Sequence, residues 1–146
     1  MEIKFTKRQY ETLMRLVYLG TWVVNGFKAD DKNEETDALE QHVYSQARKF
    51  GLDKLVPYDE EFDGWFPTQE AEEEWSEDLD RFRDDTFWDE LEYRLADRDL
   101  VAQYGESVVD HMDPEARLRM EDKLVDHYNE EFAKNGLKNF VLVRPN

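Results

Sequence analysis

Several residue types on which common enzyme sites depend are missing or scarce in this sequence. No cysteine occurs among the 146 residues, which excludes disulfides, thiolate nucleophiles and cysteine zinc sites and is compatible with a reducing cytoplasm. The six glycines are scattered singly, so there is no P-loop or G-x-G-x-x-G loop to bind phosphate. No serine lies in a G-x-S-x-G elbow. These absences favour a non-enzymatic protein without a cofactor, although they do not exclude every enzyme.

The sequence also lacks a long hydrophobic segment. Its main apolar stretch, residues 13–24, is too short to cross a bilayer, which needs about 20 residues. The stretch follows Lys4, Lys7 and Arg8 without a small-residue cleavage site, a pattern that is not typical of a signal peptide. We therefore expect a cytoplasmic protein that does not bind membranes.

Positive charge is scarce as well. The chain has 19 lysines and arginines against 36 aspartates and glutamates, which gives a net charge of −17. Direct binding to nucleic acid or to anionic lipid is disfavoured, because both depend on lysine and arginine. An acidic surface can attract a basic protein or imitate nucleic acid, but solubility alone is the simplest explanation of net charge. A partner drawn by this charge would be a protein of basic character.

What the sequence does have is one segment, residues 13–24, that is apolar on two sides. At helical spacing one side holds Tyr10, Leu13, Met14, Val17, Thr21 and Val24, and the other holds Leu16, Leu19 and Val23. We expect this helix to be buried at the centre of the fold, with acidic amphipathic helices around it. The second apolar side also raises the hypothesis of a homodimer.

Capping residues set the expected ends of this central helix. Thr6 and Gln9 predict a capping box at its start. Asn25-Gly26 predicts a left-handed end. Gly20 in its interior suggests the close approach of another helix, since glycine there costs up to about 1 kcal/mol relative to alanine.

Apolar stripes predict further helices over 34–50, 69–84, 86–104 and from Pro114 to Asn135. Their inward positions include Leu39, Trp75, Phe82, Trp88 and Leu118. Gly51 is the predicted C-terminal cap of the first of these helices, and Asp113 is the predicted N-cap of the last. The two middle segments could form one bent helix, because no proline or glycine separates them. Residues 105–112 are expected to form a loop, and residues 1–5 could pair with 140–143 as one small terminal β-sheet. The length suits a single domain, 1–146, with an all-α, bundle-like fold of four to five helices.

Acidic residues in the predicted helix 69–84 could bind a metal ion only if a second pair of carboxylates faced them from another helix. The magnesium site of all-α nucleotide pyrophosphatases uses E-x-x-E and, after a spacer, E-x-x-D. Glu70–Glu73 and Glu74–Glu77 match the first half, but Glu77–Asp80 lies directly beside them on the same helix. The required convergence of carboxylates is missing, so a solvated acidic face explains these residues better.

The histidines offer a second, weak metal hypothesis. His111, Asp113, His127 and Glu131 could form a site, because His127 and Glu131 share a helix face. Di-metal bundles instead use Glu-x-x-His on two helices, and that motif is absent. We expect no metal, and a metal-dependent hydrolase is the weakest of the functional hypotheses.

Aromatic residues interleaved with acids remain as the main functional signal. Trp75, Phe82 and Trp88 have the spacing of core residues, whereas Trp65 and Phe66 lie in a loop and either anchor a partner or cover the core. The candidate partner-binding set is Tyr58, Phe62, Trp65, Phe66, Glu70, Glu73, Glu74, Glu77 and Asp78. The first hypothesis is a non-enzymatic protein-interaction module, and the alternative is a nucleic-acid mimic that uses the acids of 59–99.

Overall fold

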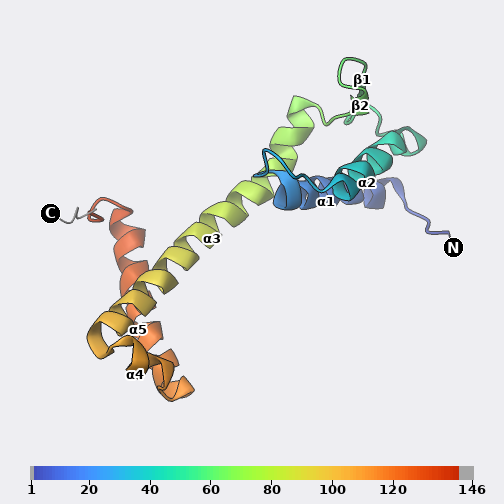
Figure 1. Cartoon of the computed structure of the whole chain (residues 1–146). Helices are drawn as coiled ribbons and strands as arrows, with labels where there is room; N and C mark the ends of the chain where they lie inside the picture. Colours follow the sequence, from blue (N-terminus) through green and yellow to red (C-terminus); the bar gives the residue numbers. More distant parts are fainter. Residues whose placement is uncertain (1, 142–146) are drawn as a thin grey trace. The chain divides into compact units, whose positions relative to one another are not determined.

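The structure, a computed structural model, describes residues 2–141 and is mainly α-helical with one small sheet (Figure 1). The predicted fold class is therefore confirmed. The elements are α1 (Lys7–Asn25), α2 (Glu34–Ser45), a 3₁₀ turn (Ala47–Phe50), β1 (Tyr58–Asp59), β2 (Gly64–Trp65), α3 (Gln69–Tyr104), α4 (Glu106–Asp110) and α5 (Pro114–Asn135).

The chain forms two compact units, unit 1 (Met1–Arg81) and unit 2 (Phe82–Asn146), and α3 contributes residues to both. Helix α3 covers both predicted segments, 69–84 and 86–104, which therefore form one helix. This alternative had been left open because no proline or glycine separates the two segments. Compact units need not unfold separately, so the single domain stays a prediction.

Helix α1 begins as the sequence predicts, but much of its second apolar side is exposed. The backbone N–H of Gln9 donates to Thr6 Oγ1 (3.3 Å), and the N–H of Thr6 donates to Gln9 Oε1 (2.9 Å), which completes the capping box. Tyr10, Met14 and Tyr18 are buried, but Leu16 is 60% exposed and Val23 is 65% exposed. The predicted burial of the second side is therefore wrong for Leu16 and Val23, whereas Leu19 of that side is partly buried against the core of unit 1.

Two expectations about glycines in α1 are also wrong. Gly26 has φ −62°, so the helix does not end in a left-handed residue. Among residues 2–141, nothing outside the neighbouring backbone of α1 comes within 4 Å of a Cβ built on Gly20, so no other described helix makes a close approach there.

The core of unit 1 is built around aromatic rings. Trp75 of α3 contacts Tyr18 edge-on, with ring centroids 5.7 Å apart, and lies 6.3 Å from the ring of Tyr44. Tyr10 stacks on Phe50 at 3.9 Å, and its hydroxyl donates to the Val43 carbonyl at 2.7 Å. The buried set is Tyr10, Met14, Tyr18, Val43, Tyr44, Ala47, Leu52, Val56, Ala71 and Trp75.

The second predicted helix, 34–50, is divided in the structure. Helix α2 ends at Ser45, and a 3₁₀ turn over Ala47–Phe50 ends at Gly51. Gly51 has φ 65°, a left-handed conformation that glycine adopts at little cost, so the predicted end residue is confirmed. Leu39 is exposed, which makes its predicted inward position wrong.

The small sheet does not lie at the termini. Residues 2–5 form no strand, Phe140 and Val141 form none either, and the remainder of 140–143 lies outside the described residues. The antiparallel pair is instead β1 with β2, in which Tyr58 pairs with Trp65 and Asp59 with Gly64. The predicted position was wrong because alternation in five residues carries little information, whereas a tight turn between two strands fixes their pairing.

Unit 2 has a smaller core. Its buried apolar residues are Leu95, Ala96, Leu100, Val109 and Phe132. Phe82 and Leu118, predicted to point inward, are exposed. Residues 106–110, predicted as part of a loop, form the short helix α4. Asp113 caps α5 as predicted, because its Oδ2 accepts from the N–H of Ala116 at 3.0 Å.

Candidate functional site

The loop that carries the predicted aromatic residues is a β-hairpin whose turn is stabilised by its own acids. Asp59 Oδ1 accepts from the N–H groups of Glu61 (2.8 Å) and Phe62 (3.2 Å), which is an Asx turn. Asp63 has φ 50°, a conformation that aspartate tolerates better than most residues, and accepts from the Tyr58 hydroxyl. Some of the acids in this segment therefore shape the backbone of the hairpin.

One side chain of α2 holds the hairpin against unit 1. Gln41 Oε1 accepts from the N–H of Trp65 at 2.8 Å, and Gln41 Nε2 donates to the Trp65 carbonyl at 3.0 Å. The amide of Gln41 thus pairs with both backbone groups of one residue, as a neighbouring strand would. The hairpin is therefore fixed in place through its backbone.

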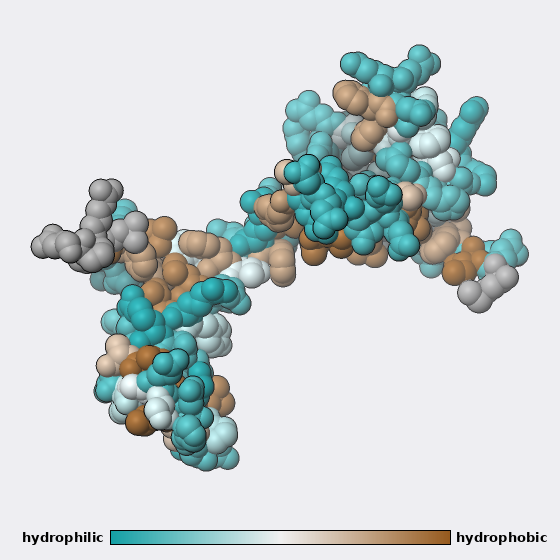
Figure 2. Space-filling view, in the orientation of Figure 1, coloured by the Kyte–Doolittle hydropathy of each residue, from teal (hydrophilic) through white to brown (hydrophobic). Residues whose placement is uncertain are grey.

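The aromatic side chains of the hairpin divide into a covered one and exposed ones. Trp65 is half-buried, packs on the core of unit 1 and contacts Tyr58 edge-on at 4.9 Å. Phe62 is 69% exposed, and Tyr58 and Phe66 are also exposed. Figure 2 shows hydrophobic atoms at the surface of the part that carries β1 and β2 in Figure 1. Two roles were left open for Trp65 and Phe66, covering the core or anchoring a partner. Trp65 covers the core, whereas Phe66 is exposed, as a residue that anchors a partner must be.

The predicted acids of α3 follow directly after the hairpin. Thr68 caps the helix, since its Oγ1 accepts from the N–H of Ala71 at 3.3 Å. Four of the five predicted acids are exposed, namely Glu70, Glu73, Glu74 and Glu77. Asp78 forms an ion pair with Arg15 of α1, so part of its charge is already compensated within the chain.

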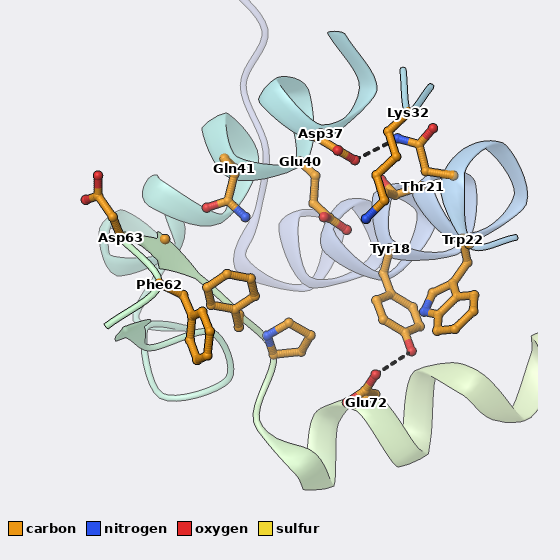
Figure 3. A pocket seen from close by; sticks show the side chains of 15 residues that line it. Tyr18, Thr21, Trp22, Lys32, Asp37, Glu40, Gln41, Phe62, Asp63 and Glu72 are labelled. Atoms are coloured by element: carbon orange, nitrogen blue, oxygen red, sulfur yellow. Dashed lines mark hydrogen bonds between the residues drawn. The ribbon is translucent and has the colours of Figure 1, made fainter. Parts of the chain in front are cut away.

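A pocket of about 500 Å³ lies in unit 1, between α1, α2, the hairpin and the first turns of α3. Figure 3 shows Tyr18 and Trp22 of α1 on one side of it and Phe62 of the hairpin on another. Its lining residues are Tyr18, Thr21, Trp22, Asn25, Gly26, Lys32, Asp37, Glu40, Gln41, Phe62, Asp63, Gly64, Phe66, Pro67 and Glu72. Among the candidates chosen from the sequence, Phe62 and Phe66 contribute to it.

The acids of this pocket are held by neutral groups. The Asn25 amide donates to Asp37 Oδ1 at 2.7 Å, and the Tyr18 hydroxyl donates to Glu72 Oε1 at 3.3 Å. The Tyr44 hydroxyl donates to Glu40 Oε1 at 3.1 Å. Within residues 2–141 no ion pair within 4.0 Å is found for any of these three carboxylates.

Burial and mutual repulsion perturb the titration of these groups. Burial raises the pKa of Glu40 above its usual value of 4.5, although the hydrogen bond from Tyr44 acts in the opposite direction. Burial, reinforced by the negative charge of Glu72, raises the pKa of Tyr18 to about 12. The raised pKa of Glu40 means that its negative charge is incompletely compensated by the protein.

Sequence reasoning missed most of the pocket. Thr21 was assigned to one apolar side of the central helix, Tyr18 was assigned to neither side, and Glu40 and Glu72 lie among many acids. The one signal that could have found Glu40 is its place one turn before Tyr44 on the same face of a helix, since a carboxylate among core residues is unusual.

The four weak metal candidates have separate structural roles. His111 Nδ1 lies 2.8 Å from the Ser107 carbonyl, and Asp113 caps α5. The ring of His127 lies near Tyr128, and Glu131 accepts hydrogen bonds from Asn135 and Asn139. Among the described residues, no group of three or more histidines and acids is arranged to hold a metal.

A second cavity of about 500 Å³ lies in unit 2. It is lined by Asp85, Trp88, Asp89, Glu92, Asn129, Phe132 and Ala133. Trp88 packs on Phe132 with ring centroids 5.4 Å apart, and Asn129 Nδ2 is 3.4 Å from both oxygens of the buried Glu92. Fewer aromatic side chains line this cavity than line the pocket of unit 1, and none of the predicted partner-binding residues is among its lining residues.

Comparison with known proteins provides no family for this chain. No protein-family model, curated protein or solved structure matches it. In the part of the chain that is described, every helix is too short or too polar to span a bilayer.

Proposed function

We propose that this chain is a cytoplasmic, non-enzymatic protein-interaction module that binds a basic partner through its hairpin and the acids that follow it. The observation that carries the proposal is the exposure of Phe62, at 69%, on a hairpin that Gln41 holds by its backbone. An aromatic residue on a hairpin whose backbone is already held by hydrogen bonds requires less ordering on binding and can become the centre of an interface. The cytoplasmic location rests on the absence of cysteine.

The charge around the hairpin supports a basic partner. Asp59, Glu60, Glu61 and Asp63 lie in the hairpin, and Glu70, Glu73, Glu74 and Glu77 follow on α3. Complementary charge would raise the association rate and disfavour acidic proteins, while the aromatic residues would supply most of the affinity.

The experiment is capture of proteins from a lysate of the source cells by the immobilised chain, at low and at moderate salt. Phe62→Ala should lose the captured protein, whereas Phe82→Ala, which removes a similarly exposed ring from unit 2, should retain it. Binding should also weaken as salt rises, because exposed charges are screened. Equal capture by Phe62→Ala and the unaltered chain would overturn the proposal.

The same experiment tests the alternative of a nucleic-acid mimic. In that case the captured protein should bind DNA or RNA, and nucleic acid should compete with the chain for it. Reversing the charges of Glu70, Glu74 and Asp78 together should then abolish capture. A captured protein that nucleic acid does not displace would favour the interaction module.

Self-association is a second proposal, favoured by the exposed side of α1. Leu16, Gly20 and Val23 lie on this side, and Figure 2 shows hydrophobic residues at the surface along α1. Helix α1 also contains three basic residues and one acid, whereas α2, α3, α4 and α5 are net acidic. Two copies of a chain with net charge −17 would therefore repel least where α1 meets α1.

Sedimentation at tens of micromolar tests this proposal. A dimer that becomes a monomer on Leu16→Glu, but not on Leu118→Glu at an exposed position in unit 2, would support it. A monomer in the unaltered chain would contradict it.

A further inference from the structure

We infer that the pocket of unit 1 binds an alkylammonium group, with its charged end at Glu40 and its alkyl stem along the aromatic rings of the hairpin. The inference deepens the proposed function, on which it rests for the natural source of the group, a lysine side chain of the basic partner.

The pocket has more negative charge than the chain itself compensates. Four carboxylates line it, from Asp37, Glu40, Asp63 and Glu72, against the single ammonium group of Lys32. The hydrogen bonds that hold Glu40, Asp37 and Glu72 come from hydroxyl and amide groups. Glu40 and Asp37 are half-buried, whereas Asp63 and Glu72 are exposed. A carboxylate that is partly removed from water without a cation is destabilised, so a cationic ligand would be stabilised at Glu40.

The remaining walls are aromatic and suit an organic cation better than a metal ion. Tyr18 and Trp22 of α1 and Phe62 of the hairpin point toward the same space (Figure 3). Aromatic faces attract ammonium groups and also pack against alkyl chains. A metal ion would instead need several converging oxygen ligands, and no such group occurs among the described residues.

The size and access of the pocket agree with this ligand. A volume of about 500 Å³ lies within the range of small-ligand pockets. Phe62, which is exposed, lies at its edge, so a lysine side chain could enter while its backbone remains on the hairpin surface.

Lys32 gives the inference a distinctive consequence. Its side chain points into the pocket in Figure 3, and no ion pair within 4.0 Å is found for it in the described chain. Lys32 is thus a competing cation, and Lys32→Ala should strengthen binding of an added amine. Lys28→Ala changes the net charge equally but lies outside the pocket, so it should have little effect.

The test is titration with n-butylammonium, followed by the NMR signal of the Trp22 indole N–H, with n-butanol as the neutral analogue. The unaltered chain should show a saturable shift with the amine and none with the alcohol. Glu40→Gln should weaken binding about tenfold, as expected for loss of a charge-assisted hydrogen bond. Glu35→Gln, an exposed neighbour outside the pocket, should bind as the unaltered chain does.

Two results would overturn the inference. One is the absence of a Trp22 shift with n-butylammonium, and the other is equal weakening by Glu40→Gln and Glu35→Gln. Far-ultraviolet circular dichroism confirms that each variant folds, and glutamine can still accept the hydrogen bond from Tyr44. Spermidine and acetyl-Gly-Lys-Gly-amide then distinguish the sources, because the tighter of the two identifies a free polyamine or a lysine side chain.

Failure of this inference is separable from failure of the proposed function. If only the pocket is wrongly assigned, Glu40→Gln still captures the partner from lysate and n-butylammonium does not shift Trp22. If only the protein partner is wrongly assigned, n-butylammonium binds and no basic protein is captured.

Discussion

Units 1 and 2 each contain a tryptophan from α3. The tryptophan of unit 1 lies at the centre of its core, whereas that of unit 2 lies at the edge of its core. Trp75 is 3% exposed and is surrounded by Tyr18 of α1 and Tyr44 of α2. Trp88 is half-buried and lies against Phe132 at the wall of a cavity. The difference shows that an apolar stripe is buried only where enough other elements cover it, and unit 1 has α1, α2, the 3₁₀ turn and the hairpin for this purpose.

Removal of a core ring from each unit should produce the largest effects. Trp75→Ala should lower the free energy of unfolding by about 3–5 kcal/mol, because the space that it leaves is enclosed. Phe132→Ala should cost less than about 3 kcal/mol, since Phe132 already borders a cavity and has fewer packed neighbours to lose. Urea denaturation followed by circular dichroism measures both values. Equal costs would show that the core of unit 2 is as tightly packed as that of unit 1.

Loss of the polar contact that anchors an element should have a smaller effect in each unit. Gln41→Ala leaves the N–H and carbonyl of Trp65 without partners and should cost about 1–3 kcal/mol. Asp113→Ala removes the cap of α5 and should cost about 1 kcal/mol. Hydrogen exchange should report faster exchange of the Trp65 amide in the first variant alone. Unchanged protection of that amide would disprove the role given to Gln41.

The pH dependence of the free energy of unfolding should reveal the raised pKa of Glu40 in the pocket of unit 1. Because folding raises the pKa of Glu40, its protonated form favours the folded state, and this contribution is lost as pH rises through the folded pKa. Glu40→Gln should therefore raise the urea midpoint at pH 7, and the difference should vanish below pH 4.5, the ordinary pKa of this residue. A variant that is less stable at pH 7 would contradict the sign.

The smallest expected effects come from ion pairs, and here the two units should behave alike. Arg15 pairs with Asp78 in unit 1, and Arg117 pairs with Asp97 at 2.9 Å in unit 2. All four side chains are partly exposed, so double-mutant cycles should give at most about 1 kcal/mol for each pair. High salt should reduce both values. A much larger value in one unit would indicate that this pair is shielded from solvent.

Most local signals in the sequence predicted local structure correctly, although the left-handed end predicted at Asn25-Gly26 is absent. The capping box of Thr6 and Gln9, the end at Gly51 and the cap at Asp113 are all present. Each depends on hydrogen bonds or backbone angles within a few residues, so no distant contact can change it.

Predictions that needed distant contacts were less reliable. Leu16, Val23 and Phe82 were expected to be buried, and all three are exposed, because periodicity identifies an apolar side without showing what covers it. The pocket was missed for the same reason. Its lining comes from α1, α2, the hairpin and α3, which are brought together only by the fold.

The contacts of Gln41 have a consequence for how this surface can change in evolution. Gln41 recognises the N–H and carbonyl of Trp65, groups that every residue except proline possesses. The attachment of the hairpin is thus indifferent to the side chains at positions such as 60, 61 and 62. Mutations there can accumulate without cost to folding, and descendants of one sequence can acquire new partners while they retain the same scaffold.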